Sequence, residues 1–467
     1  MTDPQTIHEY ATRAAEAARV FATWTGVQRR DLLHCCADTL AAAEDRIVAV
    51  AAAETGLTVA RLAGELARTT GQLRLLGDFV AAGRHRENLV SPGAAPNGTD
   101  VVAVPVPMGP VAVFAASNFP LAFGVVGGDT ASALAAGCPV VVKAHPAQPR
   151  TSRLLAELLA APLDVAPPGT FALVEGGPEV SLALVTSPPI RAVGFTGSLR
   201  GGRALMDAAA GRPDPIPVYA EMGSLNPVLV LPAAADHGQW AAALAAAVTA
   251  SVGQLCTKPG LVLVPANPAG TALAAALAAA VVAAPTHPML TGDMAADHAG
   301  WLDRAADLPG VTVTSAPPPD AAGPEHARMP RPFVVEVTPD ELSGELLEEH
   351  FGPAVVVCPA PVEAYPRLVA GLAGSLTATL IVDDNDPSDR DLAVALLPAL
   401  AERAGRIVVN GVPTGVAVCD AMHHGGPWPA TSAPWSTSVG TAAVRRFLRP
   451  VALQGVPADL AATVFPS

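Results

Sequence analysis

Short apolar segments alternate with helix-forming segments over most of this chain, and this alternation limits the folds that it can adopt. In a first block, strands are expected at residues 111–117, 139–145, 171–176, 191–197 and 217–223. A second block runs from Pro227 to about Val409, with strands expected at residues 226–232, 260–266, 333–337, 354–358 and 378–382. Strands that are separated by helices form parallel sheets covered on both faces. The sequence therefore predicts an α/β fold with two doubly wound parallel sheets.

The segments outside these strands have other patterns. Apolar residues recur at helical spacing over Ala11–Phe21, Gln28–Ala53 and Val59–Val80. Residues 84–100 are polar and rich in turn formers, which predicts a loop, and residues 101–107 alternate like an edge strand that tolerates its prolines. The Ala-rich runs 241–250 and 269–284 are too short for membrane spans and predict buried or half-buried helices.

Composition and charge exclude several classes of protein. The 467 residues include 28 basic and 42 acidic side chains, a formal net charge of −14, which argues against a nucleic-acid partner. The first residues lack the apolar core of a signal peptide, and no run suits a membrane span. Six scattered cysteines form no disulfide framework, and the pair His423 and His424 has only Asp420 and Cys419 nearby. We therefore expect a cytoplasmic protein without a metal site.

Two polar residues stand where expected strands of the first block end. Asn118 follows residues 111–117 and is either a carboxamide donor at the carboxyl end of the sheet or an Asx turn. Lys143 ends an apolar strand, where its ammonium group suits an anion or a ribose hydroxyl, or else reaches the surface. The chain has only two lysines, Lys143 and Lys258, beside 26 arginines, which favours a specific use for an ammonium group.

Three further segments combine loops or strand ends with reactive groups. Residues 194–202 form a glycine-rich turn with Gly197 and Ser198, which could hold a pyrophosphate on backbone N–H groups or be an ordinary loop. Glu221 stands in an apolar strand end, where a carboxylate must be paired or serve as a base. Most cysteines are inert core residues. Cys256 lies in a Gly/Pro loop near a lysine, which strengthens the alternative that it is a nucleophile.

Taken together, these segments resemble the aldehyde dehydrogenase superfamily. Five motifs match its order and spacing: SNFP at 117–120, GFTGS at 194–198, AEMGSLNP at 220–227, GQLCTKPG at 253–260 and EEHFGP at 348–353. Within the superfamily, residues 127–152, 218–227 and 410–432 are similar to the α-ketoglutaric semialdehyde (2,5-dioxovalerate) dehydrogenases. That similarity covers nearly the whole chain, from residues 68–76 to residues 436–451.

The resemblance implies NAD(P)-dependent oxidation of a small aldehyde to a carboxylate. Cys256 would attack the aldehyde carbon, while the Asn118 amide and the Cys256 N–H hold the oxyanion. After hydride transfer, Glu221 would activate the water that hydrolyses the thioester. The implied cofactor-binding residues are Lys143 for the adenosine ribose or its 2′-phosphate, Gly197 and Ser198 for the pyrophosphate, Glu349 for the nicotinamide ribose and Phe351 beside it.

The choice between NAD and NADP depends on the residues after Lys143. Many NAD-preferring relatives have a glutamate three residues after this lysine, which binds the ribose 2′-hydroxyl and repels a 2′-phosphate. Here that position is Pro146, and His145, Arg150 and Arg153 are close in sequence. We therefore expect NADP as the cofactor, with NAD also accepted.

The resemblance also implies three parts: a cofactor-binding domain of residues 1–88 and 108–222 with a return near 420–440, a catalytic domain of residues 223–419, and a β oligomerisation arm of residues 89–107 and 441–467. Residues 101–107 and a C-terminal strand over residues 455–460 would form the arm. Because open strand edges invite pairing between subunits, we expect a homodimer or homotetramer.

The chain departs from the subfamily just before residue 436. There Ala433, Pro434 and Trp435 replace an Asp-Ser/Thr-Arg segment. Near a substrate tunnel, losing an arginine and gaining an indole favours an apolar or aromatic aldehyde over a carboxylate-tailed semialdehyde, unless the loop only packs against a second subunit. The substrate stays open between these two classes. Glu221 disfavours acyl transfer to coenzyme A, and a catalytically silent paralogue is the remaining alternative.

Overall fold

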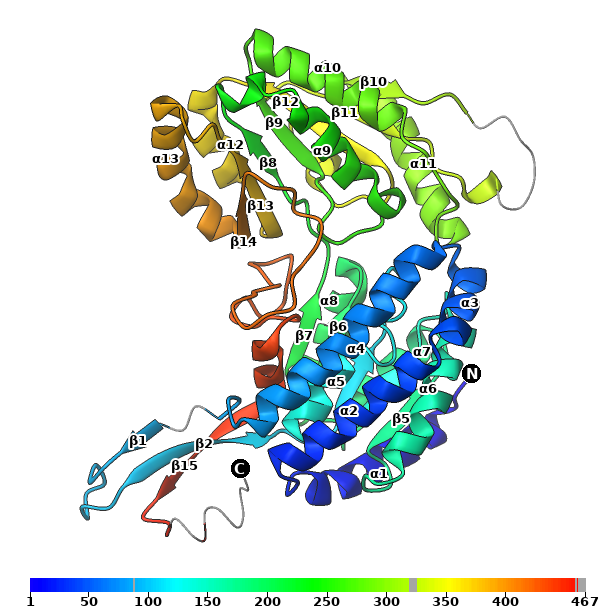
Figure 1. Ribbon diagram of the computed structural model, residues 1–467, viewed down its shortest axis with the longest axis vertical. Coiled ribbons are helices and arrows are strands. Elements are labelled where there is room, and N and C mark those ends of the chain that lie inside the picture. The colour runs from blue at the N-terminus through cyan, green and yellow to red at the C-terminus, as the bar shows by residue number, and fades with distance from the viewer. Residues whose placement is uncertain (87–88, 319–325, 458–459, 461–467) are drawn as a thin grey trace. The chain divides into compact units, whose positions relative to one another are not determined.

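The computed structural model describes residues 1–86, 89–318, 326–457 and 460 (Figure 1). It divides into two compact units, which are described one at a time. Unit 1 comprises Met1–Glu221, Ala417–Met422 and Ser436–Ser467, and unit 2 comprises Met222–Val416 and His423–Trp435. Among the residues described, no helix has the length and apolar character needed to cross a membrane.

Unit 1 begins with four helices: α1 (Pro4–Phe21), α2 (Gly26–Ala42), α3 (Glu44–Thr55) and α4 (Val59–Ala81). The prediction of one helix over Gln28–Ala53 was wrong, because α2 and α3 are separate. Ala43 between them leaves the helical region, with φ −104° and ψ 16°. Glu44 and Asp45 then place negative charge at the positive N-terminus of α3, which favours a new helix start.

The centre of unit 1 is a five-stranded sheet in which every strand pair is parallel, as predicted. Its strands are β3 (Val111–Phe114), β4 (Val140–Lys143), β5 (Phe171–Val174), β6 (Ala192–Thr196) and β7 (Val218–Glu221). The helices between them are α5 (Gly128–Ala136), α6 (Pro149–Leu163), α7 (Pro178–Thr186) and α8 (Leu199–Ala210). The strand order β5-β4-β3-β6-β7 reverses at β3, and ligands of such folds bind beyond the carboxyl ends of the strands at this point.

Both faces of this sheet are buried. Helices α1, α7 and α8 share an apolar cluster with Ala112 and Phe114 of β3. Val111 and Val113, which point to the opposite face, are also buried. Coverage on both sides explains why the strands have continuous apolar sequences instead of alternating ones.

A second sheet of unit 1 is antiparallel and joins β1 (Leu89–Ser91), β2 (Val101–Pro107) and β15 (Leu448–Gln454). Three predictions were wrong here. Residues 84–100, expected to be a loop, contain β1, and β2 lies in the middle of the sheet and not at its edge. The C-terminal strand ends before the predicted residues 455–460, because Gly455 takes φ +65°. Residues 458 and 459 of that range lie outside the described residues.

Unit 2 is built on a seven-stranded sheet of order β10-β11-β12-β9-β8-β13-β14, which is parallel except at β10. Its strands are β8 (Val228–Val230), β9 (Leu261–Pro265), β10 (Thr312–Ser315), β11 (Phe333–Glu336), β12 (Ala354–Ala360), β13 (Ser375–Ile381) and β14 (Ala404–Val409). Strands β10 and β14 were not predicted from the sequence. Both are edge strands with partly exposed side chains, so they lack a continuous apolar run.

Helices cover both faces of the unit 2 sheet as well. Helices α9 (Gln239–Thr249) and α10 (Pro268–Val282), the two predicted Ala-rich helices, pack on one face. Helices α11 (Gly292–Ala306), α12 (Tyr365–Gly371) and α13 (Pro387–Arg403) pack on the other. The short 3₁₀ turns are η1 (Ala234–Asp236), η2 (Ala250–Gly253), η3 (His326–Arg328), η4 (Gly344–Leu347), η5 (Val362–Ala364) and, in unit 1, η6 (Thr441–Phe447).

Candidate active site

The carboxyl ends of the unit 1 strands bring several predicted site residues to one edge of the sheet. Lys143 at the end of β4 pairs with Phe114 of β3. Glu221 at the end of β7 pairs with Thr196 of β6. A cavity of about 330 Å³ opens at this edge, and its lining includes Lys143, His145, Pro146, Gly197, Ser198 and Gly201. Three of the predicted cofactor-binding residues therefore share one cavity.

Lys143 supplies the positive charge of this cavity. Only 8% of its surface is exposed. Burial lowers the pKa of its ammonium group, and attraction from Glu179 opposes that shift. Burial also lowers the pKa of His145 to about 4, so the imidazole is neutral at pH 7. The cavity thus combines a buried ammonium group with a neutral ring.

The two arginines near Lys143 in sequence do not join it. Arg153 donates two hydrogen bonds, of 2.7 and 2.6 Å, to the carboxylate of Glu175. Arg150 is exposed and does not line the cavity. Of the three basic neighbours that the sequence suggested, only His145 lies in the cavity beside the lysine.

The glycine-rich turn after β6 leads directly into α8. The hydroxyl oxygen of Ser198 accepts a hydrogen bond from the Gly201 N–H at 3.1 Å, so the hydroxyl proton can still reach another acceptor. Gly197 donates its own N–H to the Glu221 carbonyl at 3.0 Å, so that N–H is already used. A Cβ atom at Gly197 would lie 2.6 Å from the Phe195 ring. The turn suits an anion through Ser198 and the N-terminus of α8. Gly197 is required because the Phe195 ring leaves no room for a side chain.

Asn118 lies in the loop after β3, and helix α4 holds this loop. Arg61 donates a hydrogen bond of 2.6 Å to the Asn118 carbonyl, and its guanidinium lies 4.9 Å from the centre of the Phe119 ring. Glu65, one turn along α4, accepts from two successive backbone N–H groups of the loop at 2.7 and 2.9 Å. Burial raises the pKa of Glu65, and the charge of Arg61 opposes that shift. The sequence analysis missed both residues, since their spacing shows only that they share a helix face.

Glu221 is a buried carboxylate with a hydroxyl donor. Only 4% of its surface is exposed at the end of β7. Ser438, which follows more than two hundred residues later, donates its hydroxyl to Oε2 of Glu221 at 2.6 Å. A buried carboxylate needs such a donor to offset its lost hydration.

Cys256 belongs to unit 2 and lies between α9 and β9, after a strained turn. Residues 251–253 have φ values of 52°, 47° and 70°, in the left-handed region. A Cβ atom at Gly253 would lie 1.9 Å from the Gly352 carbonyl oxygen, so only glycine fits there. The Gly352 N–H donates to the Gly253 carbonyl at 3.2 Å. The turn thus packs directly on residues 348–353, the predicted nicotinamide-ribose segment.

The side chain of Asn226 fixes the loop on the other side of the cysteine. Its amide nitrogen donates to the carbonyls of Cys256 and Lys258, at 2.8 and 2.9 Å. Its amide oxygen accepts from the Ser224 hydroxyl at 2.6 Å and from Thr377 of β13 at 3.1 and 3.2 Å. The cysteine loop is therefore attached to the centre of the unit 2 sheet.

Lys258 also holds the loop that contains Cys256. Its ammonium group donates to the Ala354 carbonyl at the start of β12, at 2.8 Å. Burial lowers the pKa of Lys258 to about 8, and attraction from Glu349 opposes that shift. The scarcity of lysine had suggested a specific use, and the structure places this ammonium group under the cysteine loop.

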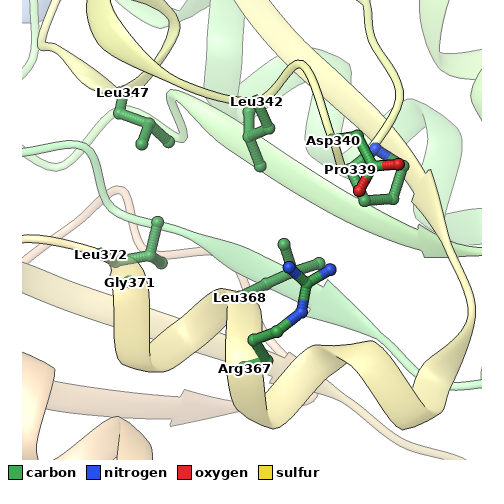
Figure 2. A pocket seen from close by; sticks show the side chains of 8 residues that line it. All are labelled: Pro339, Asp340, Leu342, Leu347, Arg367, Leu368, Gly371 and Leu372. Atoms are coloured by element: carbon green, nitrogen blue, oxygen red, sulfur yellow. The ribbon is translucent and has the colours of Figure 1, made fainter.

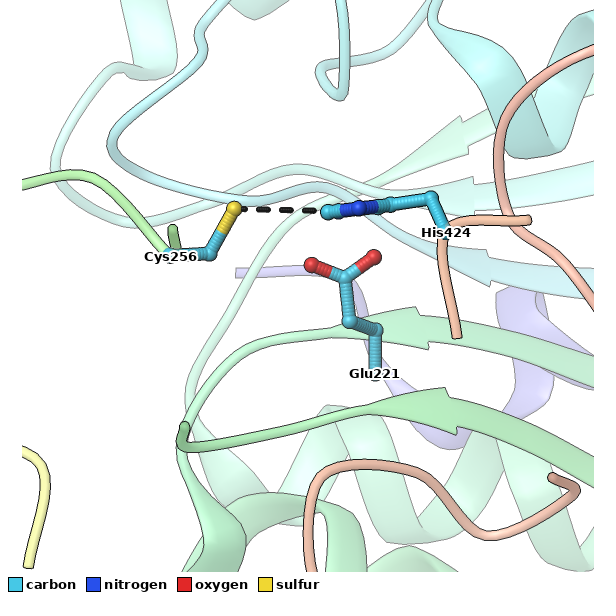
Figure 3. Close-up of side chains that lie close together, drawn as sticks. All are labelled: Glu221, Cys256 and His424. Atoms are coloured by element: carbon cyan, nitrogen blue, oxygen red, sulfur yellow. Dashed lines mark hydrogen bonds between the residues drawn. The ribbon is translucent and has the colours of Figure 1, made fainter. Parts of the chain in front are cut away.

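Cys256 contacts a histidine of its own unit. Its sulfur atom lies 3.8 Å from Nε2 of His424, and Figure 3 shows this contact as a dashed line. His424 is buried and Cys256 half-buried. A thiol beside an imidazole can pass its proton to the ring nitrogen and become a nucleophilic thiolate. The sequence analysis considered His424 only as a metal ligand, because no spacing rule connects it to a cysteine 168 residues away.

Glu349 and Phe351 lie on the segment that backs the cysteine turn. Phe351 packs against the apolar cluster of Val252, Met289 and Ala295. A Cβ atom at Gly223 would lie 3.1 Å from Oε2 of Glu349. The glycine therefore lets the carboxylate approach the backbone closely.

The loop that carries His424 also carries the divergent residues 433–435. Burial lowers the pKa of the neighbouring His423, and hydrogen bonding to the backbone of Pro434 opposes that shift. Trp435, which comes next, is 79% exposed. The indole is therefore free to meet a ligand or another protein surface.

In the described part of the chain, a hollow in unit 2, of about 380 Å³, is lined by none of the predicted site residues. Figure 2 shows Leu342 and Leu347 facing Leu368 and Leu372 across it, with Asp340 and Arg367 beside them.

Comparison with known proteins agrees with the motifs. Residues 1–365 match the sequence profile of the aldehyde dehydrogenase family. The α-ketoglutaric semialdehyde dehydrogenase 2 of Azospirillum brasilense is 45% identical over 448 residues, which cover 92% of this chain and 83% of that protein. The α-ketoglutaric semialdehyde dehydrogenase of Acinetobacter baylyi is 41% identical over 465 residues, covering 96% and 86%.

A solved structure shows the same fold. A 3,6-anhydro-L-galactose dehydrogenase in complex with NAP has a TM-score of 0.85 and 22% identity, over 97% of this chain and 92% of that one. Together with the profile match, this confirms the predicted family and its α/β fold. The chain belongs to the aldehyde dehydrogenase family, whose members oxidise aldehydes with NAD(P).

Proposed function

We propose that this protein is a hydrolytic semialdehyde dehydrogenase, which oxidises 2,5-dioxovalerate or a similar semialdehyde to its carboxylate with NADP. The observation that carries the proposal is the contact between Cys256 and His424. The loop that contains Cys256 is held by the side chain of Asn226. The two semialdehyde dehydrogenases that are 45% and 41% identical support the substrate class.

In the first half of the reaction, His424 takes the thiol proton of Cys256, and the thiolate attacks the aldehyde carbon. The carbonyl π electrons move to oxygen, and the Asn118 amide and the Cys256 N–H stabilise that oxyanion. Loss of one such donor costs about 3–4 kcal/mol of transition-state stabilisation. When bound, NAD(P)⁺ would supply the hydride acceptor, and loss of the hydride from the same carbon would leave an acyl thioester on Cys256.

In the second half, Glu221 takes a proton from water, and the resulting hydroxide adds to the thioester carbon. The C–S bond then breaks, which releases the carboxylic acid and returns the sulfur as thiolate. General-base catalysis of this kind contributes about 10²–10⁴-fold. The presence of Glu221 favours hydrolysis over transfer of the acyl group to another thiol.

The cavity in unit 1 fits the adenosine half of the cofactor. The Lys143 ammonium group serves the ribose or its 2′-phosphate, and the Ser198 hydroxyl and the N-terminus of α8 serve the pyrophosphate. Gly197 lets the turn pack against the Phe195 ring beside the pyrophosphate. Glu349 binds the nicotinamide ribose, and Phe351 packs beside it. Pro146 and neutral His145 leave a 2′-phosphate unopposed, which supports NADP over NAD.

A second candidate substrate follows from the exposed indole of Trp435 and the missing arginine before it. An apolar or aromatic aldehyde is the class that these changes favour.

We also propose that residues 89–107 and 441–467 act as an oligomerisation arm of a homodimer or homotetramer. Residues 1–88 and 108–222 would bind the cofactor, and residues 223–419 would carry the nucleophile. A cytoplasmic location suits a catalytic thiol, which must stay reduced.

The test is the initial rate of reduced-cofactor formation with NAD or NADP, crossed with 2,5-dioxovalerate, succinic semialdehyde, a long-chain aldehyde and benzaldehyde. Turnover of 2,5-dioxovalerate with NADP that vanishes in Cys256→Ala supports the proposal. Activity confined to benzaldehyde or the long-chain aldehyde supports the second candidate. Cofactor binding without turnover of any aldehyde contradicts both and points to a silent paralogue.

A further inference from the structure

We infer that Ser438 is a positioning residue for Glu221: its hydroxyl group fixes the orientation of the carboxylate and stabilises the ionised form that takes a proton from water. The inference rests on the proposed role of Glu221. The hydrogen bond from Ser438 Oγ to Glu221 Oε2 is 2.6 Å long, and the two residues are 6% and 4% exposed. A short bond between buried partners holds a carboxylate more firmly than one in water.

Hydrogen bonds and close packing hold the backbone on both sides of Ser438, which gives its hydroxyl a defined position. The Thr437 hydroxyl donates to the Val439 carbonyl at 2.8 Å, which closes a turn around Ser438. Gly440 follows with φ +88°, and a Cβ atom there would lie 2.4 Å from the Cys419 carbonyl oxygen. The backbone therefore has one arrangement on either side of Ser438.

Two further contacts fasten the end of this segment to unit 1. The Thr441 hydroxyl donates to Asp420 at 2.9 Å. Beyond it, Arg446 lies 2.8 Å from Asp129 of α5, and both side chains are almost fully buried. These contacts hold the segment without touching the Glu221 carboxylate, so they offer control positions.

Glu221 is held independently from the sheet side. Glu221 pairs with Thr196 in the register of β6 and β7, and its backbone carbonyl accepts a hydrogen bond from the Gly197 N–H at 3.0 Å. The backbone of the glutamate is thus fixed by the sheet, and the Ser438 hydroxyl sets where its side chain ends. A carboxylate has about four lone-pair sites, so the bond to one hydroxyl group does not by itself exhaust its capacity to accept hydrogen bonds.

A hydroxyl group is a suitable partner for a general base. A lysine or arginine at this place would hold the carboxylate ionised but weaken it as a base, because the full positive charge stabilises the anion strongly. Burial alone would favour the protonated acid, which cannot accept a proton. A neutral hydroxyl donor such as Ser438 lies between these extremes and favours a carboxylate that is both ionised and basic.

The test is Ser438→Ala, studied by rapid mixing with 2,5-dioxovalerate and NADP. We expect the first-turnover burst of reduced cofactor to keep its rate, while steady-state turnover falls roughly tenfold, as for loss of a hydrogen bond to a charged group. The acid limb of the steady-state pH profile should move to higher pH, because the ionised carboxylate loses its donor. Ser438→Thr, which keeps the hydroxyl, should restore the profile.

Thr441→Ala is the matched control, since it loosens the same segment at Asp420. It should leave the acid limb in place. Retained NADP binding by Ser438→Ala shows that the variant is folded. An unchanged acid limb and steady-state rate in that folded variant, or an equal shift in Thr441→Ala, would overturn the inference.

Glu221→Gln separates this inference from the proposed function. Burst formation followed by arrested turnover in Glu221→Gln, with normal behaviour of Ser438→Ala, rejects only the role of Ser438. Normal turnover in Glu221→Gln rejects the proposed role of the glutamate itself, and the inference about Ser438 with it.

Discussion

The guanidinium of Arg61 donates a 2.6 Å hydrogen bond to the backbone carbonyl of Asn118. Helix α4 thereby fixes one end of the loop whose carboxamide is proposed to bind the oxyanion. Glu65, whose carboxylate lies 3.9 Å from the same guanidinium, fixes the other end through two backbone N–H groups. A helix that contains no proposed catalytic residue thus controls where one of them lies.

Glu65→Ala should destabilise unit 1 and slow the first chemical step. The substitution leaves two buried N–H groups without their carboxylate acceptor, at about 1–3 kcal/mol each. We therefore expect the free energy of unfolding in urea to fall by about 2–6 kcal/mol, and the burst of reduced cofactor to slow. Asp207→Ala, which removes an exposed i,i+4 partner of Arg203, is the control and should cost less than about 0.5 kcal/mol. Equal stability of the two variants would contradict the role of Glu65.

His424→Gln should lower the reactivity of Cys256. Without an imidazole 3.8 Å away, the thiol keeps its proton, and general-base assistance worth about 10²–10⁴-fold is lost. The measurement is the alkylation rate of Cys256 by iodoacetamide in the absence of substrate, read by mass spectrometry at that peptide. The burst rate with aldehyde should fall in parallel.

His423→Gln is the matched control for this substitution. His423 is the neighbouring histidine, but the contact with the Cys256 sulfur is made by His424. Its loss should leave alkylation within a few-fold of the wild type. If both variants alkylate at the wild-type rate, His424 does not activate the cysteine.

The sequence predicted strands with continuous apolar runs, and β2 by its alternating pattern, but missed edge strands with partly exposed side chains. Continuous apolar runs identify β3 and β9, whereas β10 and β14 lie at sheet edges with partly exposed side chains. The break between α2 and α3 was not predicted either. Alanine favours helices, so only the backbone conformation of Ala43 shows that α2 ends there.

The same limit applies to the candidate site. Lys143 and Glu221 could be predicted from local sequence, because each is the last residue of an apolar strand. The carboxyl ends of parallel strands lie at one edge of the sheet. The partners of these residues come from far along the chain. Ser438 lies 217 residues after Glu221, and His424 lies 168 residues after Cys256, so no periodicity or spacing connects them. Motif residues were predictable, whereas the groups that orient them required the tertiary structure.

Pro146→Glu should shift the cofactor preference from NADP toward NAD. Residue 146 lines the cavity beside Lys143, so a carboxylate there would accept from a ribose 2′-hydroxyl and repel a 2′-phosphate. We expect the ratio of kcat/KM for NADP to that for NAD to fall by about tenfold or more, which corresponds to about 1.4 kcal/mol. Pro146→Gln has nearly the same shape without the charge and should change the ratio much less. Equal ratios in the two variants would show that charge at this position does not select the cofactor.

Lys258 should give the protein a distinctive stability profile at alkaline pH. Burial lowers its pKa from 10.5 to about 8, so between these values the unfolded chain binds a proton that the folded chain does not. Stability rises with pH wherever the unfolded state binds more protons, so the contribution of Lys258 increases from about pH 8 to pH 10.5 and is constant below pH 8. Relative to Lys258→Met, which cannot titrate, the free energy of unfolding of the wild type should increase by up to about 3 kcal/mol across this window. Subtracting the two urea-unfolding curves at each pH cancels the other titrating groups, and a difference that stays flat would mean that Lys258 keeps an ordinary pKa.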